Sequence, residues 1–277
     1  MSVDRGATGR SGSYTRRVSR LAGLILAILV VLLAVGLGLN AWVDDLGRSL
    51  GQRSLPTLAP GQTPPPTPAP TLEPAELSAA FLGPSTRTTS SGTVRLRVVP
   101  VDDLVLPSGA LAAADPFFAD AEPFEARLAP GRYPVDLLVG TFDDRDERVV
   151  AARVMVPGSA TSEWREARTQ TTATAAASPG FLVGYGVDSG NGSFFSPEAG
   201  AAAMADAGFV DRLVAALNRA PNSSWGWADL VVDPGTGANI VAFSSGFGDG
   251  AYATYVGLDA SGGPVAFMTD FAVLDHP

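Results

Sequence analysis

The hydrophobic pattern near the N-terminus predicts one membrane-spanning element. Residues 21–39 carry no charged or strongly polar side chain. A helix of this length spans roughly 28 Å, close to the ~30 Å hydrocarbon core of a bilayer. Trp42 follows at the depth of an interfacial aromatic belt, before Asp44 and Asp45. We therefore expect one N-terminal transmembrane helix over residues 21–43.

The charges around this segment predict its orientation. Five arginines and a single acid, Asp4, lie within residues 1–20. Because positive charge stays inside, residues 1–20 are expected to form a cytoplasmic basic tail and the main domain to be extracytoplasmic. A cleaved signal peptide is the alternative, but its apolar region is shorter, and no convincing Ala-x-Ala site follows. The expected localisation is the cell membrane, with a single pass.

A proline-rich stretch follows and predicts an extended linker over residues 44–75. Eight of the 19 residues from Pro56 to Pro74 are proline. Such a sequence forms neither helix nor sheet and favours polyproline II, at about 3.1 Å per residue. A ligand for an SH3-type domain is the alternative, but a spacer fits this position better.

Short hydrophobic segments bounded by Gly, Pro and Asp dominate the rest of the chain, residues 76–277, and predict strands. The charged turn 143–146 and the segments 233–237 and 259–263 are expected to close hairpins, the second through a type II turn. The predicted strands are Thr93–Val99, Tyr133–Phe142, Arg148–Val156, Phe181–Val187, Trp227–Val232, Asn239–Phe243, Tyr252–Leu258 and Val265–Phe271.

One segment has helical signals. Ser196 suits an N-cap, Pro197 the first helical position, and Pro221 ends the element. Gly208 is expected to divide this helix, and Glu163–Thr169 to add a further turn. The expected fold class is α+β: a mainly antiparallel β-sheet domain with few helices, plus one N-terminal transmembrane helix.

Composition excludes several kinds of chemistry. The chain has no cysteine and one histidine, His276, so disulfides, thiolate nucleophiles and nearly every Ser-His-Asp scheme are excluded. The net charge is −9, and 24 of the 28 acids lie after residue 75. Because nucleic-acid binding needs a basic face, we expect no nucleic-acid partner. We also expect no cofactor.

Two glycine-rich loops carry the candidate site residues. The first, 186–194, contains Asp188, and the second, 244–250, contains Asp249. Together with Asp270 these carboxylates are candidate ligands of a calcium ion, a hard cation that prefers oxygen. The alternative is that both loops are structural turns, with Asp188 capping its own loop. Positive φ angles are expected at one or more of the glycines 246, 248 and 250.

Three further features have ordinary structural explanations. The acidic cluster Asp143, Asp144, Asp146 and Glu147 is typical of a solvated loop. Trp225 and Trp227 either stack on a sugar or belong to the core. His276 lies in a terminus that is expected to fray.

Several phrases together resemble the bacterial family called domain of unknown function 4241. They are Leu106–Gly109 with Ala114–Pro116, Pro130–Val135, Gly186–Gly190, Phe243–Tyr252 and Thr269–Phe271. The resemblance covers about residues 94–274 and leaves out the predicted anchor and linker. It implies a single α+β domain and carries no established activity or site.

Two functional hypotheses follow. The first is a non-catalytic interaction module, held outside the membrane, whose partner is a protein or a cell-wall component. The alternative is a carboxylate-based hydrolase, acting on glycans, that uses a pair among Asp115, Asp188, Asp249 and Asp270. Two carboxylates about 5–10 Å apart suffice for glycoside hydrolysis without histidine.

Overall fold

The computed structural model describes residues 72–89, 92–143, 145–175, 184–219 and 224–274. The chain divides into two units, Met1–Pro64 and Pro65–Pro277, and all described residues belong to the second. The predicted tail, the predicted transmembrane helix and nearly all of the predicted linker lie outside the described residues. Within the described ranges, no helix is long and apolar enough to cross a membrane. The first described helix begins at Pro74, so a domain boundary at residue 76 would cut it.

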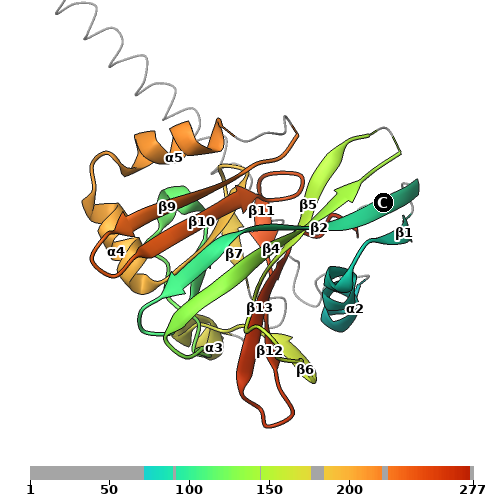
Figure 1. The fold of residues 1–277 in the computed structure, drawn as a ribbon, viewed down its shortest axis with the longest axis horizontal. Helices are drawn as coiled ribbons and strands as arrows, with labels where there is room; N and C mark the ends of the chain where they lie inside the picture. Colours follow the sequence, from blue (N-terminus) through green and yellow to red (C-terminus); the bar gives the residue numbers. More distant parts are fainter. Residues whose placement is uncertain (1–71, 90–91, 144, 176–183, 220–223, 275–277) are drawn as a thin grey trace, which may run out of the picture. The chain divides into compact units, whose positions relative to one another are not determined.

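A seven-stranded antiparallel sheet, sheet A, is the larger layer (Figure 1). The predicted hairpins β4–β5 and β12–β13 are confirmed, because a short polar turn joins each pair of apolar strands. In spatial order the strands are β1 (Ser85–Thr89), β2 (Gly92–Leu106), β4 (Gly131–Thr141), β5 (Glu147–Met155), β13 (Pro264–Asp270), β12 (Thr254–Leu258) and β6 (Glu163–Glu166).

A four-stranded antiparallel sheet, sheet B, is the second layer, and a two-stranded ribbon adjoins it. Sheet B has the order β3 (Ala112–Ala114), β8 (Asn191–Phe195), β10 (Ala238–Ser244) and β9 (Trp227–Asp233). The ribbon pairs β7 (Tyr185–Val187) with β11 (Gly250–Tyr252). The strand predicted over Phe181–Val187 is therefore found from Tyr185, and residues 181–183 lie outside the described part.

The two sheets share one hydrophobic core. Phe243 of sheet B lies edge-on to Phe194, with ring centroids 5.1 Å apart, and 6.0 Å from Phe271, which follows β13 of sheet A. Phe267 of β13 stacks on Phe124 at 5.4 Å. Because side chains from both sheets interdigitate here, the relative position of the sheets is set by packing, in the way of a β-sandwich.

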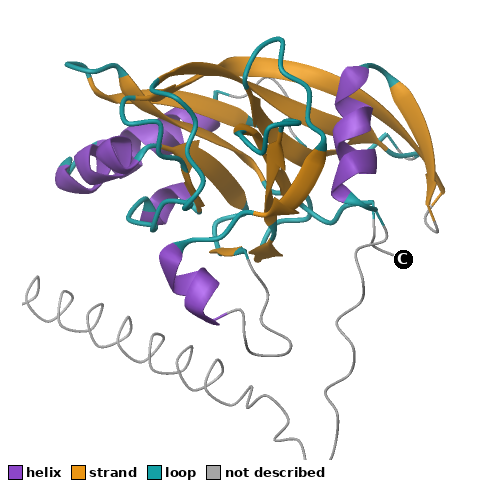
Figure 2. Cartoon of the chain, turned by 90° about the horizontal axis from the view of Figure 1, so that it is seen from below, coloured by secondary structure: helices purple, strands orange, loops and turns teal. Residues whose placement is uncertain are grey.

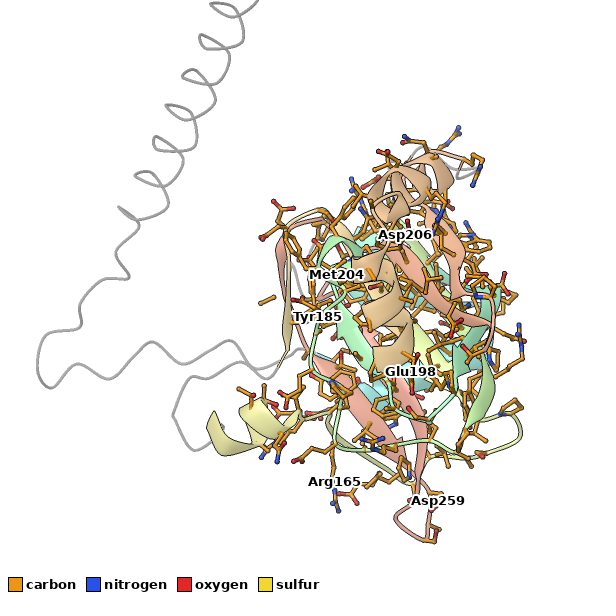
Figure 3. The ribbon with its side chains drawn as sticks, turned by 90° about the vertical axis from the view of Figure 1, so that its left-hand side faces the viewer. Arg165, Tyr185, Glu198, Met204, Asp206 and Asp259 are labelled. Atoms are coloured by element: carbon orange, nitrogen blue, oxygen red, sulfur yellow. The ribbon has the colours of Figure 1, made fainter. Side chains whose placement is uncertain are left out.

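Helices cover the outer faces of both sheets (Figure 2). The predicted helix is present and divided as expected at Gly208, into α4 (Pro197–Ala205) and α5 (Phe209–Leu217), with Ser196 as its N-cap. Buried side chains of both helices pack on sheet B, while Met204 of α4 is 45% exposed (Figure 3). The shorter elements are α2 (Pro74–Ala79), η1 (Ala80–Leu82), η2 (Pro116–Phe118) and α3 (Gln170–Ala175).

Two local predictions were wrong. Glu163–Thr169 is not a helical turn, because its first four residues pair with β12 as the edge strand β6. The turn 233–237 does not place its positive φ at Gly235, as a type II turn requires. Gly237 has φ +77° and donates its N–H to the Asp233 carbonyl at 2.8 Å. In the first case tertiary pairing overrides local propensity, and in the second the Asp233 carboxylate selects the turn through Gly235 N–H and Thr236 Oγ1.

Candidate functional site

The two glycine-rich loops lie against each other at the end of the β7–β11 ribbon. Val187 pairs with Gly250, and the Ser245 N–H donates to the Gly190 carbonyl at 3.1 Å. A Cβ on Gly190 would lie 3.7 Å from the Gly248 Cα atom. We refer to residues 188–190 and 245–249 together as the rim.

The buried carboxylate of Asp115 binds the first loop of the rim through hydrogen bonds. Asp115 is 2% exposed, and its carboxylate accepts hydrogen bonds from four donors. Oδ1 accepts from Phe117 N–H at 3.0 Å and Ser189 Oγ at 2.9 Å, and Oδ2 from the N–H groups of Asp188 at 3.0 Å and Ser189 at 2.8 Å. Asp188 was expected to cap its own loop, but Asp115 caps it from another segment. Asp115 is thus fully engaged in joining η2 to the rim.

The Ser244–Gly250 loop is compact because its glycines and Tyr252 allow it. Gly246 has φ +59°, and a Cβ there would lie 2.6 Å from Val273 Cγ2; Gly248 has φ +114°. The expected positive φ angles are therefore confirmed at two of the three glycines. The Tyr252 hydroxyl lies within hydrogen-bond distance of the carbonyls of Ser245, at 3.1 Å, and Gly248, at 2.7 Å. Tyr252 therefore anchors the backbone of this loop, while the side chains of Phe247 and Asp249 are exposed to solvent.

The predicted carboxylates separate into three environments. Asp115 is buried, while Asp188 and Asp249 are exposed on the rim, where continuation of the β7–β11 ladder would place them opposite each other. Asp270 ends β13 and accepts the N–H of Ala272 at 2.9 Å, where the chain turns with φ +52°. The described residues contain no group of three or more His, Cys, Asp or Glu arranged to hold a metal ion, these carboxylates included.

An exposed aromatic ring projects from the rim. Phe247 is 51% exposed. Its ring centroid lies 6.5 Å from that of Phe142, and the Arg148 guanidinium carbon lies 5.6 Å from it. Arg148 in turn pairs with Asp146 at 2.7 Å. The ring is therefore supported by the turn between β4 and β5 while part of its surface faces solvent.

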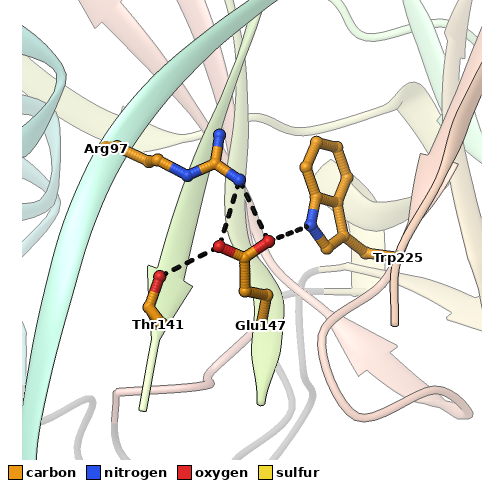
Figure 4. Close-up of polar contacts among 4 residues, drawn as sticks. All are labelled: Arg97, Thr141, Glu147 and Trp225. Carbon is orange, nitrogen blue, oxygen red and sulfur yellow. Dashed lines mark hydrogen bonds and ion pairs between the residues drawn. The ribbon is translucent and has the colours of Figure 1, made fainter. Parts of the chain in front are cut away.

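A polar network beside this turn was not predicted (Figure 4). The Glu147 carboxylate accepts from Arg97 Nη2 at 3.0 and 3.2 Å, Trp225 Nε1 at 3.0 Å and Thr141 Oγ1 at 3.1 Å. Burial acts to raise the pKa of Glu147, but the hydrogen bonds from Trp225, Arg97 and Thr141 outweigh it, so the pKa is lowered. The network joins sheet A to the segment that enters β9.

This network corrects the interpretation of Glu147 and decides between the two alternatives for the tryptophans. Glu147 does not belong to a solvated acidic loop, because it is half-buried between the sheets. Trp225 is 8% exposed and Trp227 half-buried against the core, so these side chains do not form an exposed pair for sugar stacking. Thr141 pairs with Glu147 across β4 and β5, so the two side chains lie on one face of the sheet. The alternation of inward and outward residues in the two strands could have predicted this contact from the sequence. Asp144 and His276 lie outside the described residues.

A separate groove lies at the other edge of sheet A. Its volume is about 680 Å³, and none of the candidate carboxylates lines it. Arg165 and Arg168 border it, and they pair with Glu163 and Glu166 at 2.7 and 3.3 Å. Charged side chains of this kind protect an exposed sheet edge from pairing with other chains, and they explain the composition of β6.

Comparison with known proteins adds a family and no activity. The model of a family described as "Protein of unknown function (DUF4241)" matches residues 104–269, which is more than half of the chain. The match includes Asp115 and both loops of the rim. No curated protein and no solved structure matches the chain.

Proposed function

The chain belongs to the DUF4241 family of proteins of unknown function, and we propose that its folded domain is a non-catalytic binding module whose contact surface is the rim. In this proposal a single-pass membrane anchor and the proline-rich linker hold the domain outside the cytoplasm, where its partner is a protein or a cell-wall component. The hydrophobic pattern and charges of residues 1–75 support this arrangement.

The observation that carries the proposal is Phe247, an aromatic side chain exposed on a rigidly supported loop. An exposed aromatic ring gains free energy when a partner covers it, and rigid anchors lose little entropy on binding. Asp115, Tyr252 and the Glu147 network hold the loops and turns around this ring through buried or half-buried hydrogen bonds. Such support is typical of preorganised binding surfaces.

The charge of the rim indicates the chemistry of the partner. Asp188 and Asp249 belong to the same rim as Phe247 and are exposed. Residues 76–277 hold 24 acids and 12 arginines, so the domain repels anions and attracts cations. A partner that presents ammonium or guanidinium groups fits both the carboxylates and the aromatic face.

The geometry supports binding better than the alternative, glycan hydrolysis. Hydrolysis needs a general acid whose pKa is raised in a desolvated site, opposite a second carboxylate. Asp115 is buried but has four donors on its carboxylate, and Asp188 and Asp249 are exposed to solvent. An Asp188–Asp249 pair is the form of the hydrolase hypothesis that can still be tested.

The proposal is tested by binding of the full chain, kept in mild detergent, to cell-wall and membrane-protein fractions. Phe247→Ala should weaken binding at least about tenfold, as loss of an interface hot spot does. Val214→Ala is the matched control, because Val214 is an exposed apolar residue of α5 (42%) away from the rim. Equal affinity of both variants, or no binding by the wild type, would refute the proposal. Release of sugars that Asp249→Asn abolishes would instead support the hydrolase.

The topology has its own test. Alkaline phosphatase folds to an active enzyme only outside the cytoplasm, so a fusion after Pro70, upstream of α2, should be active. A fusion within residues 1–20 is the matched negative control. An inactive Pro70 fusion that is expressed at normal level would refute the predicted orientation.

A further inference from the structure

The N-terminal part of the described domain is a peripheral strap. It consists of α2, η1 and β1, residues Pro74–Thr89, and lies outside the 104–269 family match. The strap follows directly on the proline-rich stretch and lies on sheet A (Figure 1). Among the described residues, β1 is the edge strand of the sheet and its one partner is β2.

A few apolar residues hold the strap on the sheet. Leu77, Ala80 and Phe81 are 1%, 3% and 6% exposed. Other features of its helices are weak: the N-cap position of α2, Glu73, makes no side-chain capping bond, and Leu82 is 87% exposed. Helices of this length are not stable by themselves, so α2 and η1 depend on those three buried side chains, while β1 is held by its pairing with β2.

Docking of the strap also buries a charge that is incompletely paired. The Arg153 guanidinium carbon lies 4.3 Å from the centroid of the Phe81 ring, and the Arg153 side chain is 9% exposed. Nη2 pairs with Asp136 at 3.1 Å, but Nε has no hydrogen-bond partner among the described residues. A buried donor without a partner costs free energy, which water would restore if the strap opened.

We propose that the strap is a separate cooperative unit, which opens from sheet A while the rest of the domain stays folded. Its docked state balances burial of three apolar side chains, the β1–β2 pairing and the cation–π contact of Arg153 with Phe81 against desolvation of Arg153. Local opening of this kind is expected where few buried contacts hold a peripheral segment. Because the strap follows the proline-rich stretch in sequence, a force on that stretch would act first on the strap.

The strap also has a route to the rim, and this part of the inference rests on the proposed function. β1 leads to β2, where the Thr93 N–H donates to Asp143 Oδ2 at 3.3 Å. Asp143 follows Phe142, whose ring lies 6.5 Å from that of Phe247. Because Thr93 pairs with Thr88 of β1, an open strap would leave this support of the 142–146 turn without its neighbouring strand.

Hydrogen–deuterium exchange of the full chain in mild detergent tests the inference. Amides of α2 and β1 should exchange faster than those of β4 and β13, and Phe81→Ala should accelerate them further, on the order of a hundredfold. β4 and β13 should be unchanged. Leu82→Ala is the matched control, since it removes an adjacent but exposed side chain and should change nothing.

Two outcomes would overturn the proposal. One is that strap and core amides exchange at the same rate and that Phe81→Ala accelerates all of them equally. The other comes from the double variant Arg153→Met with Asp136→Asn, which removes the buried charge and should slow exchange of the strap severalfold. Faster exchange of the strap in that variant would show that buried Arg153 stabilises the docked strap, which contradicts the proposal. A strap that opens while residues 141–148 are unaffected would overturn only the connection to the rim, whatever binds there.

Discussion

Replacement of Asp115 by asparagine tests whether hydrogen bonds to its buried carboxylate stabilise the rim. Asn has the same shape, but it offers one acceptor oxygen and an NH₂ group that cannot accept. If Oδ1 keeps Phe117 N–H and Ser189 Oγ, the NH₂ group faces the N–H groups of Asp188 and Ser189. Two hydrogen bonds to a charged acceptor are then lost.

The magnitude follows from those two bonds. Hydrogen bonds to charged groups contribute about 1.5–3 kcal/mol each, and a buried donor left without a partner costs a similar amount. We expect Asp115→Asn to lower the free energy of unfolding by about 3–5 kcal/mol. For a domain of this size that corresponds to a fall in Tm of roughly 6–20 °C.

Thermal melting followed by circular dichroism measures this difference. Asp188→Asn is the matched control, because Asp188 lies on the rim and is exposed, so its replacement should change stability by less than about 0.5 kcal/mol. Equal melting temperatures for wild type and Asp115→Asn would refute this prediction, since the two lost hydrogen bonds would then contribute nothing to the folded state.

Three further predictions concern other charges. Burial, followed by the charge of Asp102, raises the pKa of Asp229 above 3.8, although the hydrogen bond from Asn239 acts against this. Because the folded state then holds the Asp229 proton more tightly than the unfolded state does, the free energy of unfolding should fall as pH rises through the raised pKa. Asp229→Asn should remove this pH dependence of stability, measured by urea titrations between pH 4 and 7. Asp249→Asn should change stability by less than about 1 kcal/mol, and calcium should not shift the melting temperature of the wild type; a shift of a few degrees would contradict the turn assignment. Glu147→Gln should destabilise the domain by about 1–3 kcal/mol in chemical denaturation, because one acceptor oxygen is lost from a half-buried network, and unchanged stability would count against that role.

Local pattern was sufficient for much of the fold. The β4–β5 and β12–β13 hairpins, and the helix divided at Gly208, follow from alternation, turn residues and caps that act within a few positions. β6 was missed because Glu163–Glu166 has no strong propensity of its own. It is a strand only because β12 offers it a hydrogen-bonding edge.

The candidate site shows the same division between local and tertiary causes. Asp188 and Asp249 stood out because glycines surround them, and the β7–β11 pairing brings them to one rim. Asp115 and Glu147 have their main partners 74 and 78 residues away in sequence, at Ser189 and Trp225. No periodicity reports a contact of that kind.

The sequence by itself therefore determined the absence of cysteine chemistry, the strand-rich class of the domain, its acidic charge and the two glycine-rich loops, while the membrane anchor and the extracytoplasmic location stay predictions. Those properties depend on composition and on interactions between near neighbours. The tertiary structure decided which carboxylates are engaged and which are exposed, that Phe247 projects from the rim, and that Arg153 is buried beneath Phe81. These depend on how two sheets pack, because burial and hydrogen-bond partners are set by residues that only folding brings together.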